Sequence, residues 1–195
     1  NERIAALYDY FWKESELFLV MEYIQGKRVQ EIMAKKDRLS EQKALKLACN
    51  IVCALDYIHA KGVVHGGLSS HNVFLEEGTR RIKLDDVSLH RVLQESGLEV
   101  SEWDHENGPY LPLGKIGDGA EVDVYSVGCM IYFMLTGELP TSKGAPSFST
   151  SLTKKVPEEI GKILETALLR FEFKSVRDFY RSLLDLLQKF KETER

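Results

Sequence analysis

The chain has 195 residues, of which 44% are hydrophobic and 29% are charged, and this suits one sizeable folded domain or two small ones. The formal net charge of −4 offers no positive surface for a polyanion, so we do not expect nucleic acid as a partner. No run of about eighteen apolar residues occurs, so we expect no membrane span. The composition therefore favours a soluble globular protein.

The three cysteines are odd in number and form no CxxC pair. Cys49 and Cys53 lie four residues apart in a helical pattern, so they share one face of the helix. We expect packed core thiols there rather than half of a metal site. This cysteine usage predicts a reducing, intracellular compartment, which is the cytoplasm in the simplest case. The sequence opens on NERIAALYDYF, without an initiator Met or a signal pattern, so we expect a piece of a longer protein.

Two apolar segments open the chain, residues 4–11 and 16–23, and both are rich in Leu, aromatic and β-branched side chains. The polar stretch WKES joins them, so we predict a β-hairpin. Residues 26–37 (GKRVQEIMAKKD) follow as a short predicted helix. The first long predicted helix begins after Ser40, a good N-cap residue, and ends near Gly62. Its apolar face repeats every 3.6 residues and consists of Ala44, Leu47, Ala48, Ile51, Val52, Leu55 and Ile58.

The segments NVFL and RIKL flank a turn that contains Gly78, and they predict a second β-hairpin. Residues 86–119 show no clear period, and a long irregular segment of this kind is usually functional or disordered. Asp118 and Glu121 then have the spacing of a capping box ahead of VDVYSVGCMIYFMLTG. That predicted helix is apolar nearly all round, so we expect it to run through the middle of the domain.

Two further helices are predicted at the C-terminal end of the chain. Pro157 suits the first position of a helix that runs to about Arg170. The last helix begins near Ser175, and its buried stripe consists of Val176, Phe179, Leu183, Leu186, Leu187 and Phe190. The predicted fold class is therefore mainly α with two small β-hairpins.

The stretch VVHGGLSSHNVFL, residues 63–75, has a composition that suits chemistry. It reads as a short apolar strand, a polar loop and a second apolar strand. The loop holds two His, one Asn and two Gly, but it contains no carboxylate and no Lys. The sequence thus has the frame of a catalytic loop without the residues that move protons or stabilise transferred charge.

Four motifs, in order, resemble the C-terminal lobe of a eukaryotic-type protein kinase. LFLVMEYIQGK resembles the last strand of the small lobe and the hinge, and HGGLSSHN resembles the catalytic loop written H-R-D-L-K-x-x-N. IKLDDVSL resembles the strand into D-F-G, and DVYSVGCMIYFMLTGELP resembles the central helix. The resemblance covers residues 1–195. It implies the last small-lobe strands and the hinge over residues 1–24, and a helical lobe over residues 25–195.

The resemblance also implies a small lobe upstream of residue 1 in a longer parent. No G-x-G-x-x-G and no V-A-I-K occurs in this chain, and in the family both motifs precede the hinge. The glycine loop and the strand Lys are therefore expected outside the sequence in hand.

The matching positions carry over residue by residue. His65 matches the family's loop His and is expected to be structural. Asn72 matches the metal-binding Asn, and Asp86 matches the Asp that holds Mg²⁺ on the nucleotide phosphates. Asn72 has a second open role, which is to hydrogen-bond the loop alone. Asp123 matches a buried Asp that hydrogen-bonds the backbone of the catalytic loop, so its expected role is structural.

Four positions depart from the family pattern. The catalytic Asp, which accepts the substrate proton, is replaced by Gly67, and the phosphate-neutralising Lys is replaced by Ser69. The Phe and Gly of D-F-G are replaced by Val87 and Ser88. The resemblance is therefore to a pseudokinase, and no catalytic residue is expected in the degenerate loop.

The resemblance implies ATP and Mg²⁺ as ligands. Met21, Glu22 and Ile24 match the hinge positions beside the nucleotide, and Phe74 matches the residue beneath the adenine ring. A Phe there is bulkier than the usual aliphatic side chain. It can stack on adenine or partly fill the pocket, and the sequence leaves both alternatives open.

The function that we expect is a regulatory or scaffolding module that binds ATP and partner proteins, such as an active kinase or a signalling complex. One alternative is an active Ser/Thr kinase of unorthodox mechanism that uses His71, Asp85 or an outside residue. We disfavour His71 as a base because its position points to solvent in the family. The other alternative is a pure protein-interaction domain that binds no nucleotide.

Overall fold

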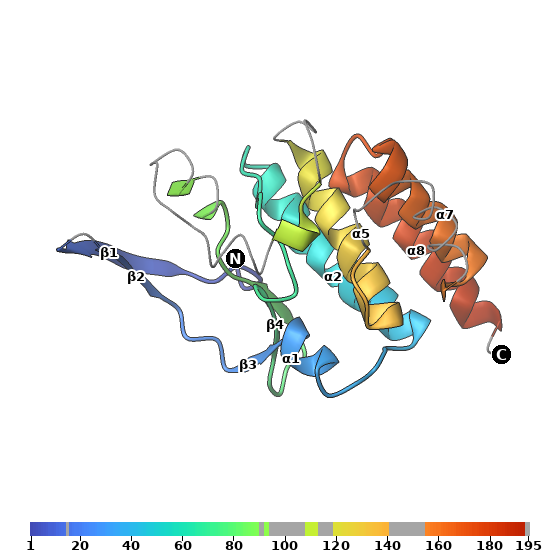
Figure 1. The fold of residues 1–195 in the computed structure, drawn as a ribbon, viewed down its shortest axis with the longest axis horizontal. Helices are drawn as coiled ribbons and strands as arrows, with labels where there is room; N and C mark the ends of the chain where they lie inside the picture. The colour runs from blue at the N-terminus through green and yellow to red at the C-terminus, as the bar shows by residue number, and fades with distance from the viewer. Residues whose placement is uncertain (15, 90–91, 94–107, 113–118, 141–154, 194–195) are drawn as a thin grey trace.

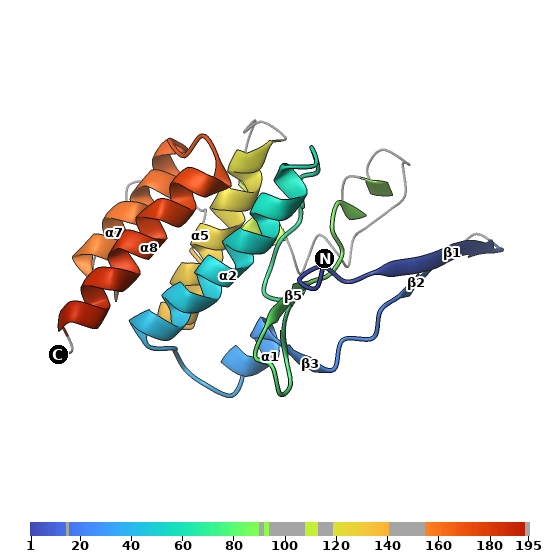
Figure 2. The same cartoon turned by 180° about the vertical axis from the view of Figure 1, so that it is seen from behind.

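Helices form the main body of the protein, and Figures 1 and 2 show them packed side by side. They are α2 (Glu41–His59), α5 (Ala120–Thr136), α7 (Glu158–Glu165) and α8 (Val176–Thr193). The computed structural model describes residues 1–14, 16–89, 92–93, 108–112, 119–140 and 155–193. Within these ranges no helix is both long and apolar enough to cross a lipid bilayer.

A β-hairpin opens the chain and projects from the helical body (Figures 1 and 2). Its strands, β1 (Leu7–Lys13) and β2 (Glu16–Met21), run antiparallel, and Phe11 lies opposite Phe18. These two rings stack with their centroids 5.2 Å apart, a cross-strand contact that stabilises a hairpin. The first predicted hairpin is confirmed. Its large exposed side chains are Leu7, Tyr8, Tyr10, Phe11, Trp12, Phe18 and Val20.

A three-stranded antiparallel sheet lies between the hairpin and the helices, with the strand order β3-β4-β5. The strands are β3 (Gly26–Arg28), β4 (Val73–Glu76) and β5 (Ile82–Leu84). The β4–β5 pair confirms the second predicted hairpin, and Gly78 in its turn has a φ of +79°. Mainly helical structure with small antiparallel sheets is therefore the observed architecture.

The prediction of a helix over residues 26–37 is wrong in its first part, where the chain forms β3. Gly26 pairs with Glu76, and a Cβ atom on Gly26 would lie 2.5 Å from the carbonyl oxygen of Leu75. Glycine permits this close approach of two backbones, which fixes the strand. The helical part is the short α1 (Val29–Met33) that follows.

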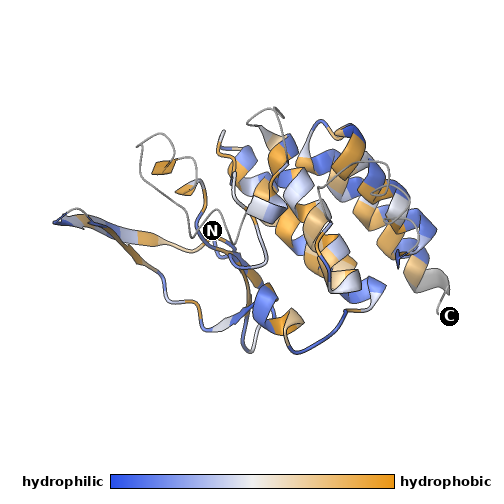
Figure 3. Ribbon diagram, viewed as in Figure 1, coloured by the Kyte–Doolittle hydropathy of each residue, from blue (hydrophilic) through white to orange (hydrophobic). Residues whose placement is uncertain are grey.

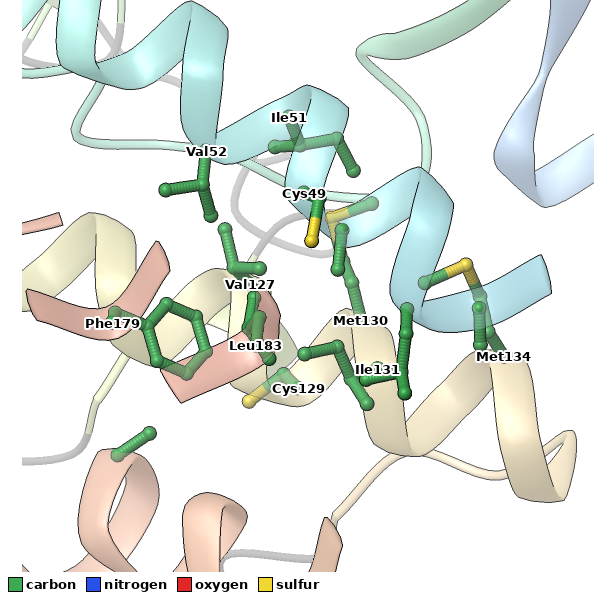
Figure 4. Close-up of a cluster of buried hydrophobic side chains, with 14 of the residues drawn as sticks. Cys49, Ile51, Val52, Val127, Cys129, Met130, Ile131, Met134, Phe179 and Leu183 are labelled. Atoms are coloured by element: carbon green, nitrogen blue, oxygen red, sulfur yellow. The ribbon is translucent and has the colours of Figure 1, made fainter. Parts of the chain in front are cut away.

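The apolar core lies between α2, α5 and α8, and Figure 4 shows side chains of the three helices interleaved there. The predicted face of α2 is buried except for Leu47, which is partly buried against the core. Almost every residue of α5 is buried, as predicted, and Figure 3 shows its apolar character. All three cysteines are free. The labelled core residues are Cys49, Ile51, Val52, Val127, Cys129, Met130, Ile131, Met134, Phe179 and Leu183.

The predicted stripe of α8 is confirmed in its buried part. Phe190 packs partly buried against the core. The fully buried members are Val176, Phe179, Leu183, Leu186 and Leu187.

A glycine stands at each end of α5 and marks where the helix begins and ends. Gly119 is the N-cap residue, and its N–H donates to the carboxylate of Glu121 at 3.3 Å. The other predicted capping residue, Asp118, lies outside the described residues. Gly137 ends the helix with a φ of +75°, as predicted, and a Cβ there would lie 2.6 Å from the carbonyl oxygen of Asp37.

Other helix ends differ in detail from the predictions. Ser40 stands at the N-cap of α2 but makes no side-chain capping bond within the described residues. Pro157 is the N-cap of α7 rather than its first helical residue. A π-helical turn, η2 (Thr166–Arg170), continues α7 to the predicted end. The irregular stretch from residue 86 to 119 includes a 3₁₀ helix, η1 (Gly108–Tyr110).

Candidate functional site

The loop between α2 and β4 is anchored by one carboxylate of the central helix. Asp123 is fully buried and accepts hydrogen bonds of 2.9 Å from the N–H groups of His65 and Gly66, one on each oxygen. The Nε2 atom of His59 lies 2.7 Å from the same carboxylate. Gly66 has a φ of +73°, a backbone conformation that glycine adopts most readily. This is the arrangement that the kinase resemblance implies for Asp123.

Asn72 braces the other end of the loop. Its Oδ1 atom accepts a 2.9 Å hydrogen bond from the N–H of Ser69, and its Nδ2 atom donates to the carbonyl oxygen of Gly67 at 2.7 Å. The carbonyl oxygen of Asn72 also accepts from the N–H of Asp85 at 2.9 Å, which ties the loop to the end of β5. Both polar atoms of this buried side chain therefore shape the loop.

The two positions that the family uses for proton and charge transfer carry no ionisable side chain. Gly67 is buried and contributes only its backbone. Ser69 is also buried, and its Oγ atom accepts from the N–H of His71 at 3.1 Å. A carboxylate at the first position and a cation at the second are what phosphoryl transfer requires of this loop.

His65 lies at the centre of the loop and is fully buried. Neither ring nitrogen has a hydrogen-bond partner among the described residues. Burial lowers the pKa of His65, and the nearby charge of Asp123 only partly opposes this effect. A neutral, fully buried imidazole suits a structural role in the loop.

A buried hydroxyl network links the loop to two other elements. Ser70 donates from Oγ to Oε1 of Gln30 on α1 at 2.7 Å, so it accepts from the hydroxyl of Tyr110 on η1, also at 2.7 Å. Ser70 and Tyr110 are 0% and 1% exposed, so breaking this network would leave buried polar atoms without partners. The network fixes the loop against α1 and η1.

The segment after β5 holds two adjacent carboxylates, Asp85 and Asp86, which are both partly buried. Burial and the neighbouring charge of Asp85 raise the pKa of Asp86 to about 6, while the charge of Arg28 opposes the rise. Ser88 has a φ of +60°. Its Oγ atom donates a 2.5 Å hydrogen bond to the carbonyl oxygen of Val64, which immediately precedes His65 of the loop. Asp86 itself has a φ of +56°.

The β3-β4-β5 sheet carries Phe74 on the face away from the apolar core. Arg28 is opposite Phe74 on β3, and Lys83 is opposite Phe74 on β5. Directly opposed residues of neighbouring strands point to the same face of a sheet. The guanidinium carbon of Arg28 lies 5.1 Å from the centroid of the Phe74 ring, which is the geometry of a cation–π contact.

The three predicted hinge residues, Met21, Glu22 and Ile24, are partly buried where the hairpin joins the sheet. The carboxylate of Glu22 accepts from the N–H of Ala6 at 3.1 Å and forms an ion pair with Lys83. The hydrogen bond from Lys83 is the main reason why the pKa of Glu22 is lowered. The Glu22 side chain thus fastens the hinge to β5.

Lys83 and Arg28 are the two charged residues of this site that sequence reasoning missed. The Lys83 side chain is only 8% exposed and lies between carboxylates of Glu22 and Glu76. A Lys between Ile82 and Leu84 in a short apolar strand was the local signal, because buried Lys requires a partner. Arg28 lies in the segment that was predicted to be helical, so its place beside Phe74 was hidden.

Comparisons with known proteins identify the family of this chain. The family model described as the protein kinase domain matches residues 1–195. The SNF1-like protein kinase ssp2 of Schizosaccharomyces pombe is 31% identical over 158 residues, which are 80% of this chain and 27% of that protein. The probable serine/threonine-protein kinase zyg-1 of Caenorhabditis briggsae is 31% identical over 162 residues, which are 80% of this chain and 22% of that protein.

A third relative, the carbon catabolite-derepressing protein kinase of Saccharomyces cerevisiae, is 31% identical over 142 residues, which are 72% of this chain. The chain spans between 22% and 27% of the length of these three relatives. Among solved structures, the kinase domain of Mycobacterium tuberculosis PknI superposes with a TM-score of 0.70 at 21% identity. That match covers 95% of this chain and 72% of the other, and it shows a shared fold.

Proposed function

The chain belongs to the protein kinase domain family, and we propose that within this family it is a pseudokinase that acts as a regulatory or scaffolding module. The observation that carries this proposal is the pair Gly67 and Ser69 inside an otherwise well-braced loop. Asp123 and Asn72 hold the loop backbone by four hydrogen bonds of 2.7 to 2.9 Å. The frame of the catalytic loop is therefore retained without its reactive groups.

The loop has no general base at residue 67 and no cation at residue 69, and each absence lowers the expected rate of phosphoryl transfer. A general base contributes about 10²- to 10⁴-fold to the rate of a proton-transfer step. Gly67 has no side chain to accept the proton of a substrate hydroxyl. The transition state of phosphoryl transfer also needs positive charge near the transferred group, and Ser69 has none. The two losses act on the same step, so we propose that the chain transfers no phosphate.

Members of the protein kinase family normally use ATP and Mg²⁺. Asn72 and Asp86 offer oxygen atoms of the kind that Mg²⁺ prefers. As they stand, however, these residues do not fit the metal well. Both polar atoms of the Asn72 side chain already bond the loop, and Asp86 lies within the field of the Arg28 cation. These observations support the second candidate function, a pure protein-interaction domain that binds no nucleotide.

The exposed hairpin supports a role in contacts between protein segments. Large apolar patches on a surface mark places where other protein surfaces pack. Trp12 is 56% exposed and Tyr10 is 65% exposed, and isolated two-stranded hairpins are only marginally stable in water. We propose that further strands of a small lobe cover this hairpin in the longer protein. The partner proteins of the module, such as an active kinase or a signalling complex, are part of the same proposal.

The experiment that tests the proposed function is a phosphate-transfer assay with labelled ATP and Mg²⁺. The full natural protein that contains this sequence is incubated alone and with generic Ser/Thr substrates. We expect no incorporation above a protein-free control. Incorporation that is abolished by Asn72→Ala together with Asp86→Ala would refute the proposed function.

A further inference from the structure

One row of side chains crosses the outer face of the β3-β4-β5 sheet. It consists of Arg28, Phe74 and Lys83, which are paired in register across the three strands. The middle residue, Phe74, presents an aromatic face, and aromatic faces bind planar bases by stacking. The two flanking residues are cations, and the structure gives each of them a different set of partners.

Lys83 is satisfied by carboxylates. It forms an ion pair with Glu22 of the hinge, and its Nζ atom lies 3.8 Å from a carboxylate oxygen of Glu76. Its side chain is 8% exposed, so this charge is held in place. Lys83 is therefore not available to a ligand on this face.

Arg28 contacts the ring face on which a base would stack. Its guanidinium carbon lies 5.1 Å from the centroid of the Phe74 ring. A guanidinium is planar and stacks on an aromatic face much as a base does.

We propose that Arg28 is an internal competitor for the nucleotide base, because its guanidinium occupies the stacking face of Phe74 when no nucleotide is present. The proposal rests on membership of the kinase family for the place of the nucleobase over Phe74, and it does not depend on whether the chain transfers phosphate. A base can stack on Phe74 only after the Arg28 side chain has moved away, which is feasible because Arg28 is exposed.

The opposite role for Arg28 would be to recruit a phosphate group. A recruiting Arg is expected to leave the face of its aromatic neighbour free for the base. Here the guanidinium of Arg28 itself lies over the Phe74 ring. The geometry therefore favours competition over recruitment, and the two roles predict opposite effects of removing the side chain.

The test compares the unmodified protein with Arg28→Ala and with Lys27→Ala. Lys27 is the matched control, because it is an exposed cation on the same strand whose side chain alternates to the other face. Adenosine is the probe, since it carries the base without phosphates and so reports stacking alone. An exposed cation–π contact corresponds to about a 2- to 5-fold effect on a binding constant.

We expect Arg28→Ala to tighten adenosine binding at least about 3-fold by calorimetry, and Lys27→Ala to leave it unchanged. Equal affinities in all three proteins, weaker binding in Arg28→Ala, or no binding in any of them would overturn the proposal. Arg28→Gln, which keeps a long polar side chain, is expected to behave like Arg28→Ala. The phosphate-transfer assay is independent of this result, so failure here leaves the pseudokinase proposal standing.

A second measurement follows the Arg28 side chain directly. In the protein without adenosine, the ring current of Phe74 should shift the NMR signals of the Arg28 side chain. Phe74→Leu should remove that shift. Saturating adenosine should remove it as well, because base and guanidinium compete for one face. A shift that persists at saturation would show that the two do not compete.

Discussion

Asp123 on the central helix and Gly66 in the loop are joined by a hydrogen bond of 2.9 Å from backbone N–H to carboxylate oxygen. The second oxygen of the same fully buried carboxylate binds the N–H of His65. One fully buried carboxylate thus accepts hydrogen bonds from two consecutive backbone N–H groups of the loop. These hydrogen bonds hold the backbone of the loop against the central helix.

Asp123→Ala is expected to lower the free energy of unfolding by about 3 to 5 kcal/mol, because it leaves buried donors unpaired. The measurement is urea unfolding followed by circular dichroism. Asp56→Ala is the control, since Asp56 forms an exposed ion pair with Arg177 at 2.6 Å, and it should cost about 0 to 1 kcal/mol. Similar small losses in both variants would mean that Asp123 does not hold the loop.

Comparing the stabilities of Gly137→Ala and Gly78→Ala separates the cost of a positive φ from the cost of a steric clash. Both glycines have positive φ, +75° and +79°, so alanine costs about 1 to 2 kcal/mol at either position. A Cβ on Gly137 would also meet the carbonyl oxygen of Asp37 at 2.6 Å, whereas Gly78 has nothing within 4 Å. We expect Gly137→Ala to cost about 1 to 3 kcal/mol more than Gly78→Ala in thermal unfolding. Equal costs would contradict the close approach.

The Tyr110 hydroxyl is expected to stabilise the loop through Ser70. Tyr110→Phe removes the 2.7 Å hydrogen bond between these two buried residues and should cost about 0.5 to 1.5 kcal/mol. Tyr8→Phe removes a hydroxyl from a side chain that is 66% exposed, so it should change stability little. If the two variants melt alike, the hydroxyl network contributes nothing measurable.

Asp86 should make stability fall as the pH rises. Burial and Asp85 raise its pKa in the folded protein from 3.8 to about 6, so the folded state holds the proton more tightly than the unfolded state. The carboxyl group therefore costs stability above pH 6, and this cost disappears as the pH falls below about 4. Asp86→Asn should raise the free energy of unfolding by about 1 to 3 kcal/mol at pH 7, with little effect at pH 4.

The control for this pH effect is Glu77→Gln, which removes one negative charge at an exposed position of the β4–β5 turn. It should leave the difference between pH 4 and pH 7 unchanged. A pH profile of Asp86→Asn that runs parallel to that of the unmodified protein would contradict the raised pKa.

The long helices could be predicted from the sequence because their apolar residues repeat every 3.6 positions along α2 and α8. The β3 strand could not be. It is three residues long, and it exists only because Gly26 lets the chain approach Leu75 of β4, far along the sequence. The residues around 26–28 do not indicate which strand they pair with, because that strand lies far along the sequence. Their local pattern therefore indicated a helix.

The site divides in the same way. Asn72, Asp86 and Asp123 could be singled out because each stands at a fixed place in a motif, and their roles as metal ligands or structural residues stay predictions. Arg28 lies outside the four motifs, and Lys83 lies in IKLDDVSL at a position to which no role was given. The contacts of both residues depend on neighbours that folding brings to them. Lys83 meets Glu22 from a position 61 residues away, and a pairing of that kind is decided by the packing of the sheet against the hinge.

The central claim is that this loop keeps its frame and has lost its chemistry, and the most direct measurement compares Gly67→Asp with the unmodified protein in the phosphate-transfer assay. We expect neither protein to incorporate label above the protein-free control. An aspartate at residue 67 restores the proton acceptor, but Ser69 still supplies no positive charge. Incorporation by the unmodified protein that depends on Asn72 and Asp86 would contradict the account.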